Sequence, residues 1–556
     1  MDKYKNEIIE SIKNSFGDKE ISINEAPNIE MGDFAIPCFS LSKELSIDFN
    51  EIFETLEKLL SKLDYIDKIE RKGGYLNLFL KREYIVRDVL NEVNVKKDLY
   101  GSSLSGKGKN AIIEHTSINP NASPHIGRAR NAFIGDCLVR LLKFEGYNVH
   151  THYFVNDVGK QIAMLVLGAR AKDNIDFKDL LNIYVDINNA LKENSALEKE
   201  AFDLLYKFEH GDASVIDEFY KVVDICIKGQ TKIFNELDIN YDYYDFESKY
   251  IFEGTTNKIL ERIDESGELF EAEDGRFAVN LDKYNLPVLV VTRNDKTSLY
   301  PLRDLAYSID KANFNYERNI IVLGEDQKLY FQQLASVLNL IGVKAPEVVH
   351  YSFVMLTSGK MSTRSGSVVL LEDAMDEAVS RVKKEMEKRY NSSVDNELIK
   401  KLAYGVVKYT ILKNSIEKNV TFDWETALNF EGNTSLYIQY NYARICSILN
   451  KAVIYEKSDA NINYSLLSDA SSYKIIKCLN AFKETIQKAS VLSSPHIICN
   501  YLFDLSKLFS KFYAENIILD ENNAALMKAR LLLIQSVKQV IKNGLNILGI
   551  DVVDHM

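Results

Sequence analysis

The stretch AIIEHTSINPNASPHIGRARN, residues 111–131, decides the fold because a strand pattern gives way to a helical one within it. Residues 111–117 form an apolar run of strand length, and a loop with two prolines follows. A helical pattern then extends over residues 129–144 and ends at Gly146, a residue typical of helix ends. A strand, a loop and a helix in this order predict the beginning of a parallel sheet with crossover helices.

Further apolar runs of strand length follow at residues 148–155, 287–292, 319–323 and 348–356. They alternate with helical stretches, which predicts a Rossmann-like, nucleotide-binding parallel-sheet core. Between about 165 and 285 the chain is rich in charged residues and helical in its spacing. This part is therefore predicted to be a helical insertion in the core.

The chain before this core has a mixed pattern. Residues 1–95 combine helical spacing with a short alternating run after Gly73 and Gly74, a turn signal. This combination predicts a small α/β domain. Residues 101–109 are rich in Gly and Ser, as flexible linkers are.

The chain after the core is predicted to be helical throughout. Apolar residues recur every three or four positions in the C-terminal part, and Gly544 is expected to end a helix there. We therefore predict a multidomain α/β protein. Its parts are a small N-terminal domain over 1–95, a parallel-sheet core over 108–390 and an all-helical bundle over 395–556.

The composition limits the kind of protein. A length of 556 residues with 46% hydrophobic content allows several packed domains. The six cysteines lie far apart, without the C-x-x-C spacing of zinc or redox sites, which fits a reducing compartment. No apolar stretch reaches the roughly 20 residues that cross a bilayer, and the N-terminus is charged throughout, so a cytoplasmic protein is expected.

The overall charge of -12 argues against a nucleic-acid partner, because phosphate contacts need Lys and Arg. Residues 401–556 differ, with 17 Lys and Arg against 14 Asp and Glu. A slightly basic C-terminal part leaves RNA binding open, although such a balance is also common by chance.

Two loops carry residues suited to binding phosphate groups. His125 precedes a helix start, where free N–H groups and the helix dipole can hold an anion, and Gly127 lets a phosphate or a flat ring approach the backbone. Residues 358–366, SGKMSTRSG, place Lys360 and Arg364 among small residues, so this loop can close on a triphosphate. Each pattern alone is also typical of an ordinary helix start or surface loop. The two loops together, both attached to the predicted sheet, favour a site that binds a nucleotide.

These loops resemble the signatures of the class I aminoacyl-tRNA synthetases. Pro124-His-Ile-Gly-Arg128 is similar to their HIGH motif, and Lys360-Met-Ser-Thr-Arg364 is similar to their KMSKS motif. Other segments resemble the arginyl enzymes of this class, and the resemblance covers essentially the whole chain, most loosely over about 165–285. These segments are GDFA at 32–35, GGYLNLF at 73–79, NDVGKQ at 156–161, YPLRD at 300–304, GEDQKLY at 324–330 and EGNTSLYIQYNYAR at 431–444.

The resemblance implies an arginine–tRNA ligase. Such an enzyme activates L-arginine with ATP to arginyl-adenylate, releases pyrophosphate, and transfers arginine to tRNA(Arg) with release of AMP. It implies a catalytic core, an N-terminal domain that contacts tRNA and a C-terminal anticodon-binding bundle, in a cytoplasmic monomer without membrane contact. Mg²⁺ is expected to accompany ATP, and no metal bound by the protein itself is expected.

The resemblance also implies roles for individual residues. The catalytic roles are expected for His125, Arg128 and Lys360. The expected ATP-binding residues are Pro124, His125, Gly127, Arg128, Lys360, Met361 and Ser362. The expected arginine-binding residues are Glu114, Asn119, Tyr300, Asp304 and Gln327.

The chemistry of arginine supports this assignment independently. A guanidinium is a planar fork of five donors without an acceptor, so a selective pocket needs carboxylates, which Asp304 and Glu114 supply. By similarity, Tyr300 shapes the pocket, and Asn119 and Gln327 hold the α-amino and carboxylate ends. The alternative for Asp304 is a helix N-cap or an ion pair with its neighbour Arg303.

The sequence departs from the family pattern at two positions. Arg128 stands where the HIGH motif usually has histidine, and Thr363 stands where KMSKS has its second lysine. The arginyl family commonly shows the second change and is thought to need bound tRNA before activation. We therefore expect activation to depend on tRNA; equally fast ATP–pyrophosphate exchange without tRNA would contradict this.

Other interpretations remain open at this point. A synthetase for glutamate would want cations in place of Asp304 and Glu114, and one for cysteine would usually bring zinc ligands that the sequence lacks. Arg128 favours a non-catalytic, RNA-binding paralogue, whereas intact Lys360 and Asn119 argue against it. A nucleotide adenylyltransferase would be shorter. His150 and His152 share one strand face, but without a third ligand we expect packed or surface histidines rather than a metal site.

Overall fold

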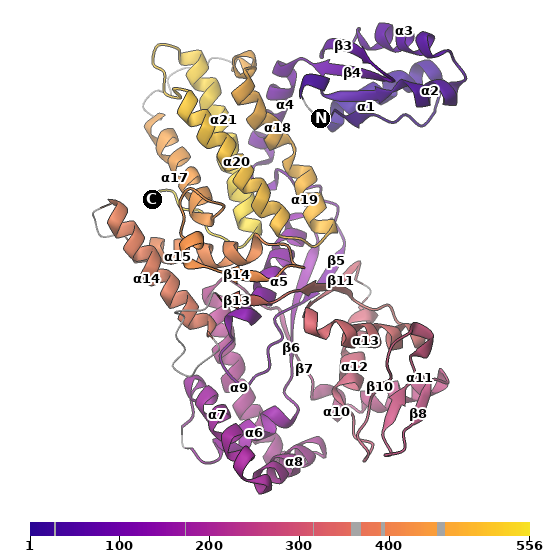
Figure 1. Cartoon of the computed structure of the whole chain (residues 1–556), viewed down its shortest axis with the longest axis vertical. Helices are drawn as coiled ribbons and strands as arrows, with labels where there is room; N and C mark the ends of the chain where they lie inside the picture. The colour runs from indigo at the N-terminus through magenta and orange to yellow at the C-terminus, as the bar shows by residue number, and fades with distance from the viewer. Residues whose placement is uncertain (27–28, 173, 315, 357–368, 391–394, 453–461) are drawn as a thin grey trace.

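The computed structural model describes residues 1–26, 29–172, 174–314, 316–356, 369–390, 395–452 and 462–556. Lys360, Met361, Ser362, Thr363 and Arg364 therefore lie outside the described residues. Figure 1 shows an elongated molecule, with a small N-terminal domain beside a helical bundle at one end and two lobes at the other end. The five-stranded core sheet lies between the helical bundle and the two lobes. In the described part of the chain, no helix is both long and apolar enough to cross a bilayer.

The N-terminal part is an α/β domain, as predicted. Its antiparallel sheet has the order β1-β2-β4-β3, and the turn between β3 and β4 needs Gly73, whose φ is +59°. Helix α4 leads out of this domain and packs against α18 and α21 of the bundle. The elements are α1 (Asp2–Phe16), β1 (Asn24–Glu25), β2 (Phe34–Pro37), α2 (Cys38–Leu45), α3 (Phe49–Leu60), β3 (Ile66–Lys72), β4 (Tyr75–Leu80) and α4 (Arg82–Lys96).

The core is a five-stranded parallel sheet of order β12-β11-β5-β6-β7, which confirms the predicted Rossmann-like fold. Its strands are β5 (Asn110–Glu114), β6 (Asn148–Val155), β7 (Tyr243–Phe246), β11 (Arg318–Gly324) and β12 (Glu347–Tyr351). Helix α5 (Ile126–Phe144) connects β5 to β6, and Gly146 follows it with a φ of +90°. The chain leaves β5 to one side and returns beside it as β11, so the carboxyl ends of these strands form a topological switch point, where such folds bind ligands.

Two predictions about the strands were wrong. Residues 287–292 do not belong to the parallel sheet: β10 (Leu289–Val290) pairs antiparallel with β9 (Phe277–Val279), which pairs with β8 (Leu269–Glu271). The run 348–356 is divided, since β12 ends at Tyr351 and β13 (Val354–Leu356) pairs with β14 (Val420–Phe422). Short apolar runs do not reveal which sheet they join.

The predicted helical insertion is not purely helical. It contains α6 (Lys160–Ala169), α7 (Phe177–Glu193), α8 (Ser195–Glu209), α9 (Ala213–Glu236), α10 (Lys249–Phe252) and α11 (Thr255–Glu265). Strand β7 also lies within this range and completes the edge of the core sheet. The sequence missed β7 because Tyr243, Tyr244 and Asp245 do not form an apolar run. Helices α12 (Tyr300–Asn313) and α13 (Lys328–Leu340) follow. They lie in the same lobe as α10 and α11 (Figure 1).

The C-terminal part is a helical bundle, as predicted. Gly544 does not end a helix but lies inside α21, where an added Cβ would come within 2.6 Å of Leu502 on α20. Its missing side chain lets the two helices pack closely. The helices are α14 (Leu371–Tyr390), α15 (Asn396–Leu412), α16 (Trp424–Ala427), α17 (Ser435–Ala452), α18 (Ala470–Asn480), α19 (Phe482–Val491), α20 (His496–Glu515) and α21 (Ala524–Ile547).

Arg130 joins the core to the bundle. Its side chain on α5 is fully buried and donates to backbone carbonyl oxygens of two separate segments. These are Ser352 (2.6 Å), which follows β12, and Ser415 (2.9 Å), Ile416 (3.2 Å) and Lys418 (2.8 Å), which lie between α15 and β14. Phe353 O also accepts from Arg130, at 3.5 Å, so one side chain binds the backbones of both segments to α5.

Candidate active site

A cavity of about 360 Å³ opens at the carboxyl ends of β5, β6 and β11, between the lobes. Its walls include residues from α5, α12 and the start of α13 as well as from these strands. Six of the predicted site residues line it together: Glu114, Asn119, Arg128, Tyr300, Asp304 and Gln327. The structure thus brings together residues that are more than 200 positions apart in the chain.

Asp304 projects from the second turn of α12, and its carboxylate Oδ2 accepts a hydrogen bond of 2.5 Å from the hydroxyl of Tyr330. It is not a helix N-cap, since α12 begins at Tyr300. Nor does it pair with Arg303, whose guanidinium donates to Glu247 at 2.5 Å. Both structural alternatives for Asp304 are therefore wrong, and its carboxylate faces the cavity.

The surroundings of Asp304 disfavour its charged form. Burial raises the pKa of this carboxyl to about 7, and the negative charges of Glu247 and Glu114 act in the same direction. The hydrogen bond from Tyr330 and the charge of Arg303 oppose this shift without cancelling it. A cation placed in the cavity would therefore stabilise the ionised carboxylate.

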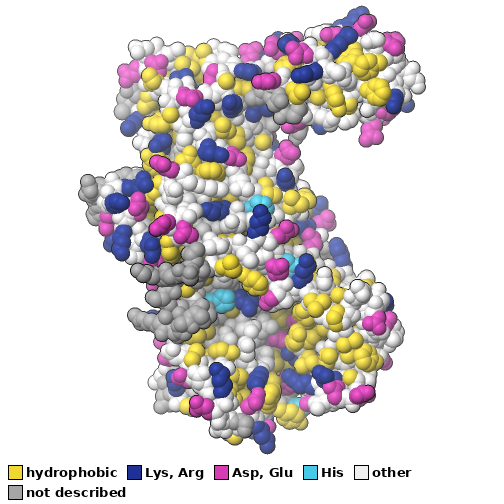
Figure 2. Space-filling model, in the orientation of Figure 1, with side chains coloured by type: hydrophobic (Ala, Val, Ile, Leu, Met, Phe, Trp, Pro, Cys, Tyr) yellow, Lys and Arg dark blue, Asp and Glu magenta, His cyan; other side chains and the backbone are white. Residues whose placement is uncertain are grey.

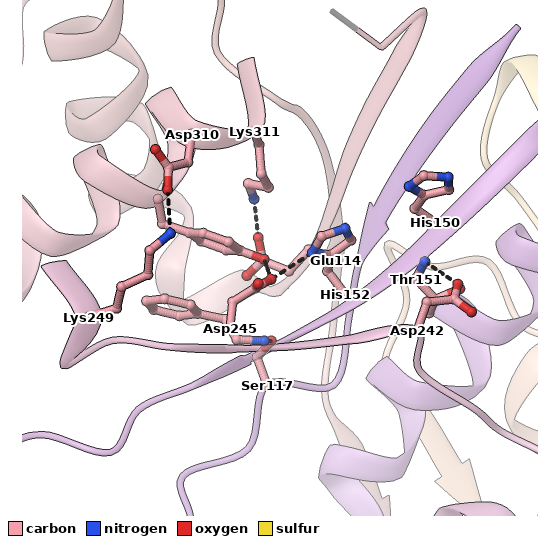
Figure 3. Close-up of polar contacts among 12 residues, drawn as sticks. Glu114, Ser117, His150, Thr151, His152, Asp242, Asp245, Lys249, Asp310 and Lys311 are labelled. Atoms are coloured by element: carbon pink, nitrogen blue, oxygen red, sulfur yellow. Dashed lines mark hydrogen bonds and ion pairs between the residues drawn. The ribbon is translucent and has the colours of Figure 1, made fainter. Parts of the chain in front are cut away.

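The other carboxylates of the cavity wall already have partners. Glu114 forms a buried ion pair with Lys311 of α12 (Figure 3). The centroid of the Tyr307 ring lies 4.1 Å from the same Lys311 ammonium. Asp326 also lines the cavity but is exposed to solvent.

Two further carboxylates lie directly behind the wall. Glu247 pairs with Arg303 and also accepts a hydrogen bond from Asn156 at 3.3 Å. Asp245 contacts His152 Nδ1 at 2.6 Å and accepts from the Tyr307 hydroxyl at 2.8 Å. Of the carboxylates that line the cavity, Glu114 is therefore paired with Lys311, whereas the half-buried Asp304 has no cationic partner among the described residues.

The remaining predicted arginine-binding residues lie around the opening. Tyr300 is 51% exposed, and its ring centroid is 5.1 Å from that of Tyr330. Asn119 follows β5 and donates from Nδ2 to Gln161 Oε1 at 2.9 Å. Gln327 precedes the first residue of α13. A ligand that fills the cavity would therefore meet amide groups at its outer end and carboxylates at its inner end.

The predicted phosphate-binding residues lie at the start of α5. His125 is the N-cap of α5, and the backbone N–H of Ile126 donates to Val369 O at 3.0 Å. Burial lowers the pKa of His125, and the positive charge of Arg128 lowers it further, so the imidazole is neutral near pH 7. Arg128 lines the cavity, whereas Pro124, His125 and Gly127 lie beside it and do not.

The backbone after β5 is strained where it meets the cavity. Thr116 and Ser117 have φ angles of +72° and +41°, which residues other than glycine rarely adopt. Asn131 of α5 holds this turn: its Oδ1 accepts from Thr116 N at 2.6 Å, and its Nδ2 donates to Val322 O of β11 at 2.8 Å. One amide thus fixes the loop, the helix and the neighbouring strand around the cavity.

Gly127 allows His125 to lie where it does. A Cβ on residue 127 would come within 3.0 Å of both Cε1 and Nδ1 of the His125 ring. We expect Gly127→Ala to displace this ring and to raise the KM for ATP about tenfold, equivalent to about 1.4 kcal/mol, while arginine affinity stays the same. Steady-state kinetics in both substrates measure this. Gly74→Ala is the matched control, because its Cβ would make only an ordinary 3.8 Å contact; an unchanged KM for ATP in Gly127→Ala would contradict the role of the glycine.

The two histidines of β6 have hydrogen-bond partners within the protein. His152 contacts Asp245 and stacks on Tyr243 at 4.6 Å, and His150 Nδ1 lies 2.9 Å from the Tyr316 hydroxyl. Within the described ranges, no group of three or more His, Cys, Asp or Glu side chains is arranged to hold a metal ion.

Sequence reasoning missed several residues that lie in the cavity wall or directly behind it. Lys311 and Tyr307 lie seven and three positions after Asp304 on α12. This spacing places them on one face of the helix, so a search for polar residues along that face could have found them. Glu247 and Tyr330 carry no such signal, because only the tertiary fold brings them to Arg303 and Asp304.

Comparison with known proteins identifies what this chain is similar to. Residues 89–424 match the family model described as tRNA synthetases class I (R), catalytic domain; residues 438–556 match the DALR anticodon binding domain, and residues 2–80 match the arginyl tRNA synthetase N terminal domain. The arginine–tRNA ligase of Methanocaldococcus jannaschii is 36% identical, over 96% of this chain and 95% of that protein. The arginine–tRNA ligase of Clostridium kluyveri is 35% identical, over 96% of each.

Solved structures share the fold. The Thermus thermophilus arginyl-tRNA synthetase has a TM-score of 0.80, with 23% identity and 99% of each chain covered. The arginyl-tRNA synthetase of Plasmodium falciparum has a TM-score of 0.78, with 22% identity, 100% of this chain and 99% of that chain covered.

Proposed function

This chain belongs to the arginyl-tRNA synthetase family, and from this premise we propose how its residues bind arginine and ATP. The enzyme attaches arginine to tRNA(Arg) at the expense of ATP. The carboxylate attacks the α-phosphorus of ATP to form arginyl-adenylate and pyrophosphate. A terminal ribose hydroxyl of the tRNA then displaces AMP from the adenylate.

One observation carries the proposed arginine site: Asp304 is a cavity carboxylate without a cation of its own. The guanidinium of arginine supplies that cation, and its N–H groups can donate to both carboxylate oxygens. The Tyr330 hydroxyl, already bound to Oδ2, fixes the orientation of Asp304. Lysine offers a point charge instead of a planar fork and would leave acceptors unpaired, which disfavours it.

The other arginine-binding roles follow from position. Glu114 shares its charge with Lys311, so it acts as a hydrogen-bond acceptor for the guanidinium rather than as its main counter-ion. Tyr300 at the mouth covers the aliphatic stem of the substrate. Asn119 and Gln327, on the outer rim, hold its α-amino and carboxylate groups.

The ATP-binding roles are proposed for the start of α5. Neutral His125 donates a hydrogen bond to a phosphate oxygen, and Arg128 at the cavity wall adds a fixed positive charge. Lys360, Met361 and Ser362 are proposed to bind ATP, with Lys360 at the pyrophosphate. No general base is required, because the arginine carboxylate is already a nucleophile; the protein positions the reactants and stabilises charge. Mg²⁺ enters with ATP as its counter-ion.

The cellular context and domain boundaries are also proposals. We propose a cytoplasmic monomer, with domains at 1–95, 108–390 and 395–556. The end of α4 at Lys96 and the start of α15 at Asn396 support these boundaries. The dependence of activation on tRNA, argued from Thr363, stays a prediction.

The decisive test is tRNA charging with each of the twenty amino acids. The purified chain is expected to charge tRNA(Arg) with arginine and with no other amino acid. Charging with a different amino acid would overturn the proposed arginine site, and no charging at all would favour a non-catalytic paralogue.

Arginine affinity is expected to depend on pH. Asp304 has a pKa of about 7 in the free protein, and the guanidinium binds its ionised form. Below pH 7 binding must release the proton, and above it no proton is released, so the Kd for arginine is expected to be about tenfold higher at pH 6 than at pH 8. Calorimetric titration measures this change. Asp304→Asn should abolish the dependence, and a flat profile in the parent protein would contradict the assignment.

A further inference from the structure

A buried cation of the protein itself lies next to the arginine pocket. The Lys311 ammonium lies behind the cavity wall, paired with Glu114, and both side chains are buried, with exposed fractions of 2% and 6%. Figure 3 shows the Lys311 side chain reaching from α12 towards the end of β5, where Glu114 is located. A buried lysine next to a site that must attract a cation requires an explanation, because like charges repel at short distance.

The charges behind the wall form two separate groups. Lys311 and Glu114 form the first, with the Tyr307 ring beneath the ammonium. Asp245, His152 and the Tyr307 hydroxyl form the second, and the positive charge of Lys311 also acts on Asp245. Lys249, Asp310 and the Tyr250 hydroxyl lie farther out on the same lobe and contact one another.

We propose that Lys311 is a positioning residue that sets the charge of the arginine pocket: it pairs with Glu114, which stays a hydrogen-bond acceptor, and leaves Asp304 as the carboxylate that a bound guanidinium neutralises. This inference deepens the proposed function and rests on it. With Lys311 in place, one guanidinium neutralises the pocket. Without Lys311, Glu114 would be a second buried carboxylate without a cation, and burial would favour its protonated form as it does for Asp304.

A protonated Glu114 would present a donor where the guanidinium needs an acceptor. Arginine binding would then have to release a second proton in addition to that of Asp304. Lys311 therefore affects the number of protons linked to binding, which a purely structural role would leave unchanged.

The experiment counts these protons. Arginine binding to the full chain is measured by calorimetry at pH 6 in two buffers of different ionisation enthalpy. The parent protein is expected to release about one proton, from Asp304, whereas Lys311→Met is expected to release nearly two and to bind arginine at least about tenfold more weakly. Lys311→Arg, which keeps the charge, should release about one.

Lys249→Met is the matched control. It removes the same side chain from a neighbouring but half-exposed ion pair with Asp310, 3.1 Å long, that does not line the cavity. It is expected to match the parent in affinity and in proton release. An equal proton count in Lys311→Met and the parent would overturn the proposal.

A second pair of variants covers the case in which Lys311→Met does not fold. Glu114→Gln leaves the ammonium uncompensated beside the substrate, and the double variant Glu114→Gln with Lys311→Met removes it. The double variant is expected to bind arginine at least about tenfold more tightly than Glu114→Gln alone. Equal affinities would overturn the role of Lys311. If Asp304→Asn also left arginine binding unchanged, the proposed arginine site itself would fail, which is a separate result.

Discussion

Asp304→Asn is expected to lower kcat/KM for arginine in ATP–pyrophosphate exchange by about 100- to 3,000-fold, equivalent to about 3–5 kcal/mol. The substitution keeps the shape of the side chain and its contact with Tyr330 but removes the charge. The guanidinium would then be buried without a counter-ion, because Glu114 and Glu247 are already paired with Lys311 and Arg303. Exchange kinetics with tRNA present, over a range of arginine concentrations, measure the loss.

Loss of folding would not explain this result. The pKa of Asp304 is raised in the folded protein, so the folded state binds its proton more tightly than the unfolded state does, and the ionised carboxylate destabilises the free enzyme above pH 7. Asp304→Asn is therefore expected to be at least as stable as the parent at pH 8. Asp310→Asn, on the same helix but in an exposed pair with Lys249, is the control and should keep kcat/KM within about twofold. A loss of less than threefold in Asp304→Asn would contradict the assignment.

Arg130→Met is expected to cause the largest loss of stability. Five backbone carbonyl oxygens of two segments would lose the guanidinium as a donor, at a cost of about 3–5 kcal/mol in total. Burial lowers the pKa of Arg130 to about 10, so the guanidinium is charged at neutral pH and its hydrogen bonds are charge-assisted. Denaturant unfolding followed by fluorescence measures the change in free energy.

The position of the increased hydrogen exchange distinguishes the loss of these hydrogen bonds from a general loss of packing. Hydrogen exchange is expected to increase first at residues 415–418, because their carbonyls are the acceptors. Arg140→Met is the matched control on the same helix: Arg140 is more exposed and binds Asp136 and Asp238, so its loss should cost less than half as much. Equal stability losses in the two variants would refute the special role of Arg130.

The sequence predicted the parts of the fold in which local pattern and burial agree. Strand β6 has the predicted bounds, 148–155, because most of its side chains are buried and its last three residues, Tyr153–Val155, form an apolar run. Strand β7 was missed because its side chains are mostly exposed or half-buried, so pairing with β6, and not hydrophobic pattern, defines it. Gly544 was misjudged for a related reason: a glycine in a helical pattern can end the helix or admit a neighbour, and only the position of Leu502 distinguishes the two.

The site residues that belong to recognisable sequence motifs could be predicted. Glu114, Asn119, Arg128, Tyr300, Asp304 and Gln327 were named from the sequence, and they line one cavity. Which carboxylate is free could not be predicted, because that depends on Lys311 pairing with Glu114 and Arg303 pairing with Glu247. The sequence interpretation treated Glu114 and Asp304 as equivalent, whereas the structure gives only one of them a cation.

The most direct test compares arginine with citrulline, its neutral isostere, in the parent protein and in Asp304→Asn. If Asp304 is the counter-ion of the guanidinium, the parent should bind arginine much more tightly than citrulline, and the ratio of the two Kd values should shrink at least about 100-fold in the variant. The same ratio in both proteins would show that the charge of arginine is held elsewhere and would contradict the account.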